Sequence, residues 1–263
     1  MKRQVIEVIT AGIDVGIENV KAVILKDGKV LASQQAPSGG ANRAASAEKV
    51  WQAALKEAGI SASDVSKVMA TGQGKYDVHF ANGNIVEPVA DARAALWYFP
   101  SARSVLDVGA DQMRAMNYDD KGAITNVVMN QKCAAAIGIS FKTLARTLGM
   151  TLDEISQVNG SAGSEAAVNE RCCNFAEMDT HWLIHEGTPK KQIVQARNEA
   201  AAVKINSLLN EKITLNKDIV LMGKVAKNAG LVKALKQRSG ANFLIPKQPE
   251  FGGALGAALV AAG

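Results

Sequence analysis

Two short segments place an aspartate and a glycine at the end of an apolar run, and this pattern suggests nucleotide chemistry. Residues 12–16 read Gly-Ile-Asp-Val-Gly, and residues 105–109 read Val-Leu-Asp-Val-Gly. An acidic side chain at a strand turn can hold a hydrated cation, and the following glycine lets backbone N–H groups approach a phosphate. Asp14 and Asp107 are therefore the candidate catalytic residues, and two such turns facing each other would form a nucleotide cleft.

Each turn is followed by the same order of extended segments. After Asp14, residues 20–25 form a strand-like run that turns and returns through residues 29–32, and residues 113–118 and 124–129 repeat this after Asp107. The pattern predicts a repeat of about 93 residues. One Asp-x-Gly segment alone is better explained by simple hairpin closure. Two copies with matching strands favour a duplicated nucleotide-binding lobe.

The composition is that of a globular protein with a substantial core. The chain has 263 residues, of which 48% are apolar. We recognise no charged-then-apolar leader, and the apolar stretch around residues 254–262 is too short to cross a bilayer, so we expect a cytoplasmic protein with no membrane partner. The net charge is +5, but the basic residues are scattered and aromatic residues make up only 5% of the chain. Nucleic acid is therefore not an expected partner.

We expect two lobes, one over residues 1–100 and one over residues 101–263, with a hinge at residues 99–104. The last helix, which Phe251-Gly252-Gly253 opens, is the one element that we assign to either lobe. Glycines at the start of a helix suit an anion at the helix N-terminus, but close helix packing explains them equally well.

Local patterns predict the elements inside each lobe. In the first lobe we expect an amphipathic helix over residues 47–58, a buried strand over 65–71 and a helix over 88–99, with Trp51 and Trp97 in the core. In the second lobe the predicted elements are helices over residues 136–148 and 190–209, a loop over 157–169, a strand over 218–222 and a helix that ends near 238.

Three cysteines form the second set of chemically interesting residues. Cys133 follows Lys132 between a predicted strand and a predicted helix, and Cys172 follows Arg171, so both thiols are expected to favour the thiolate form. A tetrahedral metal site needs four such ligands, so a cluster at these cysteines would need a partner to supply the other half. Spacing alone favours the interpretation that the cysteines are small apolar filler.

The surroundings of these cysteines resemble a known family. Residues 129–135 read Met-Asn-Gln-Lys-Cys-Ala-Ala, and residues 172–177 read Cys-Cys-Asn-Phe-Ala-Glu. Both are similar to the paired cysteine motifs of the ATPase family that includes the activators of 2-hydroxyacyl-CoA dehydratases and the ATP-binding subunits of benzoyl-CoA reductase. Segments 70–75, 223–228 and 253–258 follow in the order of the family, so the resemblance covers essentially the whole chain.

This resemblance implies an α/β protein with the actin-like ATPase fold, in which two ribonuclease-H-like lobes flank ATP and Mg²⁺. It also implies one [4Fe-4S] cluster on the two-fold axis between two subunits, each of which gives two cysteines, here Cys133 and Cys172. Cys173 lies where the family commonly has another residue, so it is expected to be a neighbour and not a ligand. The expected nucleotide contacts are Gly12, Gly16, Lys21, Gly72, Gly74, Gly109, Gly223, Lys224, Asn228 and Gly253.

Departures from the family pattern guide the choice among its members. Residues 103–110, Arg-Ser-Val-Leu-Asp-Val-Gly-Ala, are more similar to the smaller ATP-binding subunit of benzoyl-CoA reductase, so the sequence favours a reductase subunit. Its partners would be a paralogous ATP-binding subunit, the larger reductase subunits and ferredoxin as electron donor. A homodimeric dehydratase activator is the alternative. Ile17 and Lys224 stand where smaller residues would approach a nucleotide more closely, which also allows slow hydrolysis or a scaffold without ATPase activity.

The mechanism that the resemblance implies is energy coupling. Asp14 is expected at a magnesium-bound water and Asp107 at a cation or water, and closure around the γ-phosphate would shift the helices that carry the cysteines. A small-molecule kinase of the same fold stays open, and it predicts a protein without iron. His181 and His185 lie four residues apart, where a solvated or packing role is favoured over a metal pair.

Overall fold

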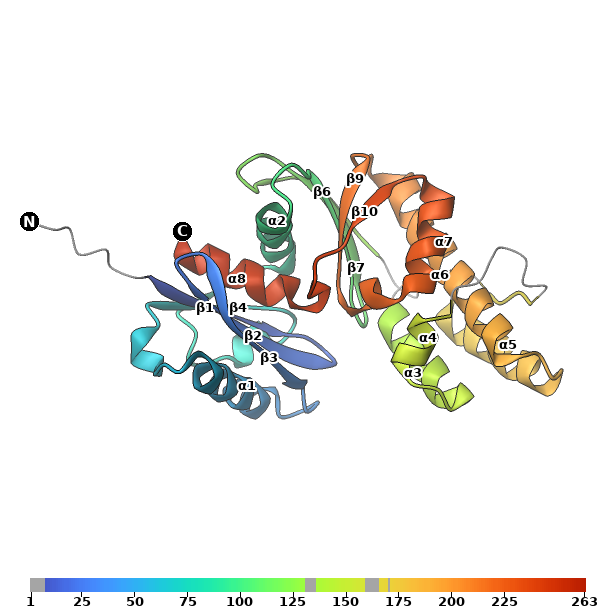
Figure 1. Cartoon of the computed structure of the whole chain (residues 1–263), viewed down its shortest axis with the longest axis horizontal. Coiled ribbons are helices and arrows are strands. Elements are labelled where there is room, and N and C mark those ends of the chain that lie inside the picture. Colours follow the sequence, from blue (N-terminus) through green and yellow to red (C-terminus); the bar gives the residue numbers. More distant parts are fainter. Residues whose placement is uncertain (1–7, 131–135, 159–165, 170) are drawn as a thin grey trace, which may run out of the picture. The chain divides into compact units, whose positions relative to one another are not determined.

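The computed structural model describes residues 8–130, 136–158, 166–169 and 171–263, which divide into two units, each with its own five-stranded sheet (Figure 1). Unit 1 contains the residues up to Pro100 together with Asp120–Ile124 and Phe251–Gly263. Unit 2 contains Ser101–Asp119 and Thr125–Glu250. In the described part of the chain, no helix combines the length and the apolar character that crossing a membrane requires.

The sheet of unit 1 has the strand order β3-β2-β1-β4-β5. Its strands are β1 (Ile9–Val15), β2 (Asn19–Lys26), β3 (Lys29–Pro37), β4 (Lys67–Thr71) and β5 (Gly83–Asn84). The first three form an antiparallel meander, whereas β4 pairs with β1 in parallel. The strand triplet predicted after the first Asp-x-Gly turn is therefore confirmed. Since β1 and β4 are parallel, their carboxyl ends lie at the same edge of the sheet.

Alternation along β1 directs successive side chains to two different helices. Ile13 belongs to the apolar cluster that includes Trp51 of α1 (Arg43–Ala58). On the other face, the hydroxyl of Thr10 donates to the carbonyl of Ala258 in α8 (Gly252–Ala262) at 2.9 Å. A β-carbon added to Gly12 would lie 2.0 Å from the carbonyl oxygen of Ala254. Gly12 is thus required for the close packing of α8 on the sheet, independently of any nucleotide.

Helix α2 (Glu87–Tyr98) packs against α8 through a second glycine contact. A β-carbon on Gly256 would lie 1.8 Å from the carbonyl oxygen of Ala90. Trp51 is buried as predicted, but the prediction for Trp97 is wrong because 39% of it is exposed. Its indole N–H donates to the carbonyl of Gly28 at 3.1 Å, so the ring lies over a hairpin turn at the surface.

The sheet of unit 2 has the order β10-β9-β6-β7-β8. Its strands are β6 (Ser104–Val108), β7 (Met113–Tyr118), β8 (Ile124–Met129), β9 (Asp218–Met222) and β10 (Asn242–Leu244). Strand β7 is antiparallel to β6, and β9 pairs with β6 in parallel. The second predicted strand triplet is confirmed, and its first two strands keep the offset of about 93 residues from those of unit 1.

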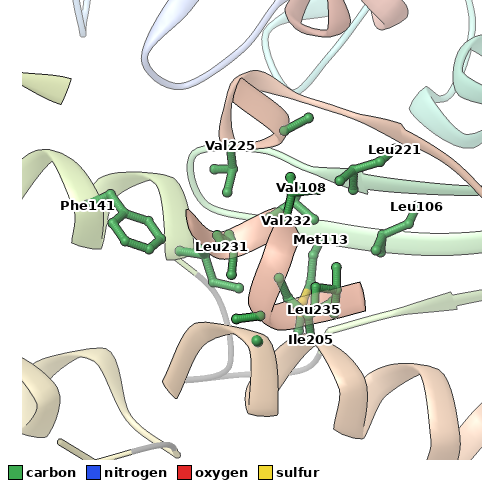
Figure 2. Close-up of a cluster of buried hydrophobic side chains, with 14 of the residues drawn as sticks. Leu106, Val108, Met113, Phe141, Ile205, Leu221, Val225, Leu231, Val232 and Leu235 are labelled. Carbon is green, nitrogen blue, oxygen red and sulfur yellow. The ribbon is translucent and has the colours of Figure 1, made fainter. Parts of the chain in front are cut away.

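The helices of unit 2 are α3 (Ile137–Leu148), α4 (Leu152–Ser156), α5 (Cys173–His185), α6 (Lys190–Lys212) and α7 (Ala229–Ser239). Figure 2 shows how α3, α6 and α7 contribute apolar side chains to one core with the sheet, including Phe141, Ile205 and Leu235. From the sheet, Leu106 and Leu221 enter the same cluster. The predicted helices at 136–148 and 190–209 are therefore confirmed, the second with a longer C-terminal end.

Candidate functional site

Asp14 is paired with a cation across the first hairpin. In the antiparallel register of β1 and β2 it lies opposite Lys21, whose Nζ is 2.9 Å from Asp14 Oδ2. Both side chains are largely buried, with 14% of Asp14 and 17% of Lys21 exposed. Lys21, which the sequence suggested as a nucleotide contact, thus lies beside the candidate catalytic carboxylate and neutralises it.

Glycines shape the backbone around Asp14. The N–H of Gly16 donates to the carbonyl of Asn19 at 3.0 Å, and a β-carbon on Gly16 would lie 3.1 Å from the same oxygen. Gly72 follows β4 with φ +88°, and a β-carbon there would lie 2.6 Å from both Asp14 Oδ1 and the carbonyl oxygen of Val15. The N–H of Gly74 donates to that carbonyl at 2.9 Å. Gly72 therefore leaves the carboxylate of Asp14 unobstructed, whereas Gly16 and Gly74 shape the turn backbone beside it.

Two further features lie beside Asp14. Thr71 is its register partner on β4, so both side chains project from the same face of the sheet. Within the described residues, the buried hydroxyl of Thr71 has no hydrogen-bond partner. Gly253, in the first turn of α8, would place a β-carbon 3.1 Å from Asp14 Oδ2. A helix N-terminus carries unpaired N–H groups and partial positive charge, so this end of β1 combines groups that suit a phosphate and its metal ion.

Unit 2 repeats the hairpin with an arginine in place of the lysine. Arg114 lies opposite Asp107 in the register of β6 and β7, and its guanidinium is 2.7 Å from Asp107 Oδ2. The N–H of Gly109 donates to the carbonyl of Gln112 at 2.8 Å, which is the same contact that Gly16 makes in unit 1. Gly223 follows β9 with φ +87°, and a β-carbon there would lie 2.1 Å from the carbonyl oxygen of Val108 and 3.0 Å from Asp107 Oδ1.

The segment after Gly223 contains two further expected nucleotide contacts, Lys224 and Asn228. Lys224 begins the short 3-10 turn Lys224–Lys227, and it is exposed. Asn228 is buried, and its Oδ1 accepts from the N–H of Leu231 at 3.1 Å as the cap of α7. Its amide group donates to Asn198 Oδ1 at 2.8 Å. These contacts show that Asn228 holds α7 in place. This structural role explains the residue type at position 228 without any ligand.

Of the two expected cluster ligands, Cys133 lies outside the described residues, and Cys172 lies at the N-cap of α5. The N–H of Cys172 donates to Asn169 Oδ1 at 2.8 Å, and the N–H of Asn169 donates to Asp179 Oδ2 at 2.7 Å. Asp179 itself belongs to α5. The backbone that carries the Cys172 thiol is therefore fixed to the helix that follows it.

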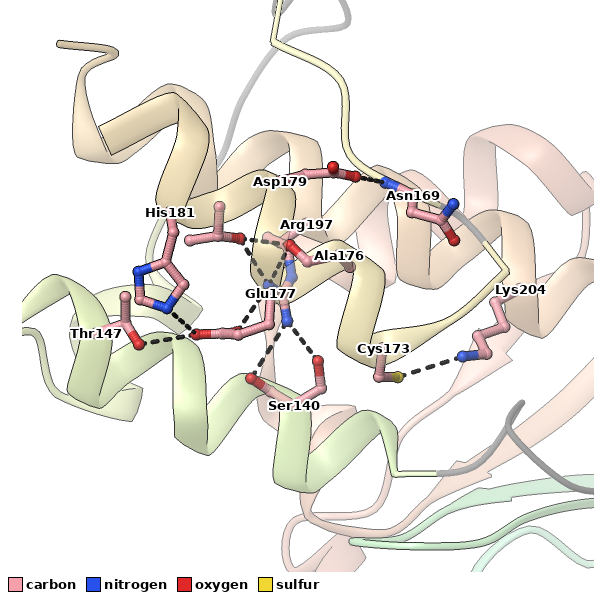
Figure 3. Close-up of polar contacts among 11 residues, drawn as sticks. Ser140, Thr147, Asn169, Cys173, Ala176, Glu177, Asp179, His181, Arg197 and Lys204 are labelled. Atoms are coloured by element: carbon pink, nitrogen blue, oxygen red, sulfur yellow. Dashed lines mark hydrogen bonds and ion pairs between the residues drawn. The ribbon is translucent and has the colours of Figure 1, made fainter. Parts of the chain in front are cut away.

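A small pocket of unit 2 brings the thiols of Cys172 and Cys173 together with basic side chains. It is lined by Ile137, Ser140, Phe141, Asn169, Cys172, Cys173, Ala176, Arg197, Ala200, Ala201 and Lys204. Figure 3 shows the buried guanidinium of Arg197 at the centre of the contacts that join α3, α5 and α6. It donates to the carbonyl of Ala176 at 3.0 Å, to Thr180 Oγ1 at 2.7 Å and to Ser140, and it forms an ion pair with Glu177 Oε2 at 3.0 Å.

The donor chemistry of this region fits one chain's share of an iron-sulfur site. Cys172 and Cys173 are half-buried thiols, and thiolates are the ligands that such clusters take. Within the described ranges, no group of three or more Cys, His, Asp or Glu side chains could hold a metal. A four-ligand site at Cys172 would therefore draw on donors from beyond these ranges. His181 instead lies 3.7 Å from Glu177 Oε1, and it is exposed, as is His185.

The two hairpin units, each with an aspartate at the carboxyl end of its first strand, define the class of protein: the chain has the actin-like ATPase fold. A ROK family glucokinase from Streptomyces griseus shares this fold with a TM-score of 0.58 over 97% of this chain and 99% of that chain, at 12% identity. The model of the BadF/BadG/BcrA/BcrD ATPase family matches residues 11–261, so the chain belongs to that family.

Individual relatives in the family fall into two groups. The chain is 34% identical to the activator of lactoyl-CoA dehydratase from Anaerotignum propionicum, over 96% of each chain. It is 31% identical to a subunit of benzoyl-CoA reductase from Thauera aromatica, over 95% of this chain and 92% of that one. The solved activator of 2-hydroxyisocaproyl-CoA dehydratase from Clostridium difficile, with bound ADPNP, has a TM-score of 0.89 at 29% identity and covers 96% of this chain and 94% of that one.

Sequence reasoning missed Arg114 and Thr71 as members of the candidate site. The signal for Arg114 was present, because a basic residue follows each aspartate by seven positions, as Lys21 does for Asp14. Thr71 is found only through the parallel register of β1 and β4, which joins residues far apart in the sequence. Cross-strand pairing across a predicted hairpin is thus the pattern that would have identified the arginine.

Proposed function

We propose that this chain couples ATP hydrolysis to one-electron transfer through a [4Fe-4S] cluster that it shares with a second subunit. Asp14 would hold the magnesium ion through a bound water, and Asp107 would orient a cation or water. Cys133 and Cys172 would be the ligands of this chain. When bound, such a cluster accepts and releases a single electron at low potential. The relatives that act on dehydratases or form part of a reductase support this proposal.

The observation that carries the proposal is the position of α3 in unit 2. At its start, the N–H of Ile139 donates to the carbonyl of Ala110 at 3.0 Å, and a β-carbon on Gly138 would lie 2.7 Å from the carbonyl oxygen of Gly109. This end of α3 is therefore packed tightly on the turn that follows Asp107. Ile137, Ser140 and Phe141 of the same helix line the pocket of Cys172. A shift of the turn on loss of the γ-phosphate would be transmitted by α3 to the thiol region.

An exposed apolar face of α5 supports a protein partner near Cys172. Phe175, Met178 and Trp182 have exposed fractions of 57%, 63% and 66%, and their spacing of three and four residues places them along one side of the helix. Large exposed apolar side chains grouped in this way are typical of interaction surfaces. We infer that another subunit covers this face and contributes the remaining cluster ligands.

The acceptor that we favour is a 2-hydroxyacyl-CoA dehydratase, which makes the chain an activator. The relative with 34% identity and the solved structure with a TM-score of 0.89 are both dehydratase activators. A benzoyl-CoA reductase subunit, which residues 103–110 favour, is the second candidate, and the 31% identity to the Thauera aromatica protein supports it. In that case a reduced ferredoxin would supply the electron and the larger subunits would reduce the ring.

The first experiment is anaerobic purification from the native source, followed by iron analysis and native mass spectrometry. A homodimer with the mass of one four-iron cluster supports the activator. A hetero-oligomer with a related ATPase chain and larger iron-sulfur subunits supports the reductase. Protein without iron contradicts both and favours a kinase. Variants are then purified under the same anaerobic conditions. Cys172→Ser is expected to lose the iron, whereas the matched Cys173→Ser variant is expected to keep it.

The ATPase part is tested separately. We expect Asp14→Asn to lower the rate of phosphate release by about 100-fold or more, because it removes the charge that would hold the metal ion. Asp64→Asn, at the exposed cap of a 3-10 turn in the same unit, is the matched control and should retain the wild-type rate. Equal rates for the two variants would contradict the role of Asp14.

A further inference from the structure

A buried lysine faces the thiol next to Cys172. Nζ of Lys204, on α6, lies 3.2 Å from Sγ of Cys173 (Figure 3), and only 8% of Lys204 is exposed. Cys172, Cys173 and Lys204 line the same pocket. The long lysine side chain therefore places a positive charge directly beside the thiol of Cys173, the neighbour of Cys172, in surroundings from which water is largely excluded.

A second cation lines this pocket, but its charge is balanced. Arg197 forms an ion pair with Glu177 and donates its other hydrogen bonds to acceptors in α3 and α5. Its role is to join the three helices. Lys204 directs its ammonium group at the sulfur of Cys173, so its charge acts on the electrostatic potential at that thiol.

We propose that Lys204, held by Cys173, raises the reduction potential of the iron-sulfur centre to which Cys172 contributes. This inference rests on the proposed function. An external one-electron donor protein of the ferredoxin class is oxidised by one electron in this step, and the centre gains that electron without making or breaking a covalent bond. The reduced centre carries one more negative charge. A fixed cation in partly buried surroundings stabilises that form more than the oxidised form.

The contact also assigns a role to Cys173, which is not an expected cluster ligand. Its sulfur accepts from the ammonium group, and this contact holds the charge at the residue that follows Cys172. Lys204 and Cys173 are accordingly residues that tune the potential, and neither needs to touch ATP or the electron acceptor.

The test is a redox titration of the anaerobic, iron-loaded protein, followed by electron paramagnetic resonance. Lys204→Met removes the charge and keeps most of the side-chain volume, so the midpoint potential is expected to fall. Lys204→Arg keeps the charge and should stay near the wild-type value. Lys236→Met, at an exposed position of α7, controls for the loss of one positive charge elsewhere in the unit. Lys204→Gln provides a second neutral variant if the methionine variant does not fold.

The outcomes separate this inference from the proposed function. A lower potential in the neutral Lys204 variants, with unchanged iron content and no comparable shift in Lys236→Met, supports the inference. Unchanged potentials in iron-loaded neutral variants overturn it and leave the proposed function intact. A wild-type protein that binds no iron under anaerobic conditions overturns both.

Discussion

The aspartate at the end of the first strand forms an ion pair in each unit, but the basic partner differs. In unit 1 the partner of Asp14 is a lysine, which presents one compact charge at 2.9 Å. In unit 2 the partner of Asp107 is an arginine, which also reaches Gln112 Oε1 at 3.4 Å and so connects the aspartate with the turn itself. A planar guanidinium holds its acceptors in a fixed direction. The comparison indicates a carboxylate that is paired with a single point charge in unit 1 and one that is held by a directional guanidinium in unit 2.

The two units also differ in the residue that lies beside the aspartate on the neighbouring parallel strand. Thr71 is the register partner of Asp14, whereas Met222 is the register partner of Asp107. Unit 1 thus adds a hydroxyl and the N-terminal turn of α8 to its aspartate, and unit 2 adds an apolar side chain. The duplicated hairpin is the same in both units, but the polar neighbours of Asp14 are better suited to a phosphate than the apolar neighbour of Asp107.

The largest expected effect comes from the glycines that follow β4 and β9. Gly223→Ala should lower the free energy of unfolding by roughly 3 to 5 kcal/mol, since strain at positive φ adds to a backbone clash at 2.1 Å. Gly72→Ala should cost somewhat less, since its closest contacts are at 2.6 Å. Urea denaturation measures both. Gly28→Ala is the control, because Gly28 has φ +74° with open space around it and should cost only about 1 kcal/mol. Similar values for all three variants would contradict the close approach.

Removal of each cation tests the comparison of the ion pairs directly. Arg114→Met should lower the free energy of unfolding by about 3 kcal/mol, because it leaves a buried carboxylate without its charged partner. Lys21→Met should lower it by a smaller amount, since the Lys21 side chain is slightly more exposed than that of Arg114 and contributes a single compact charge. Chemical denaturation of both variants at pH 7 gives the values. An equal loss in the two variants would remove the distinction between the two ion pairs.

A buried tyrosine gives unit 2 an alkaline sensitivity that unit 1 lacks at the equivalent position. Burial raises the pKa of Tyr118 from 10.0 to about 12, and the charge of Arg103 opposes part of this rise. Leu25 occupies the equivalent position of the repeat, about 93 residues earlier, and is equally buried. The folded state therefore favours the protonated phenol, and the contribution is complete below pH 10 and lost as the pH rises toward 12. The free energy of unfolding should fall by up to about 2.7 kcal/mol over this range.

Tyr118→Phe provides the measurement, since the same pH series should lack this fall. Near pH 7 the variant should be as stable as the wild type or slightly more stable, because the buried hydroxyl has no hydrogen-bond partner among the described residues. Parallel curves for the two proteins from about pH 9 to about pH 12 would show that Tyr118 does not titrate differently in the folded state.

The smallest expected effect concerns Thr71. Thr71→Val keeps the shape and removes a buried hydroxyl that has no described partner, so stability without nucleotide should change by less than about 1 kcal/mol. Affinity for Mg-ATP should fall roughly 5-fold to 10-fold if the hydroxyl binds a phosphate. Isothermal titration calorimetry measures the affinity, and Met222→Leu is the matched control in unit 2. Unchanged affinity in Thr71→Val would exclude this hydroxyl from the nucleotide site.

Much of the fold follows from local sequence patterns. The two Asp-x-Gly hairpins were predictable because strand alternation, turn residues and the repeat of about 93 residues agree. Helix α4 was missed although Thr151 and Glu154 have the spacing of a capping box. Hydrogen bonds from the N–H and the hydroxyl of Thr151 lower the pKa of Glu154 and hold this short helix at its start.

The rest depends on contacts between distant segments. Gly253 and Gly256 have the same sequence signal, yet one lies beside Asp14 and the other lies against Ala90. Only the packing of α8 separates the functional interpretation of the first from the structural role of the second. The error at Trp97 has the same origin, because its apolar character predicted burial and its hydrogen bond to a distant turn keeps it at the surface. The roles of Asp14, Asp107 and the cysteines stay predictions.

The packing of α8 on β1 has a consequence for the order in which the chain folds. Thr10 and Ala258 are joined by a hydrogen bond although 248 positions separate them. During synthesis, one face of the first sheet therefore stays uncovered until α8 has been made, whereas the core of unit 2 is complete once Phe243 has been added. Contacts of such long range form slowly, and an exposed apolar sheet face is a site for chaperone binding or misassembly. A chain that ends at Glu250 should thus yield a folded second unit and an immature first one.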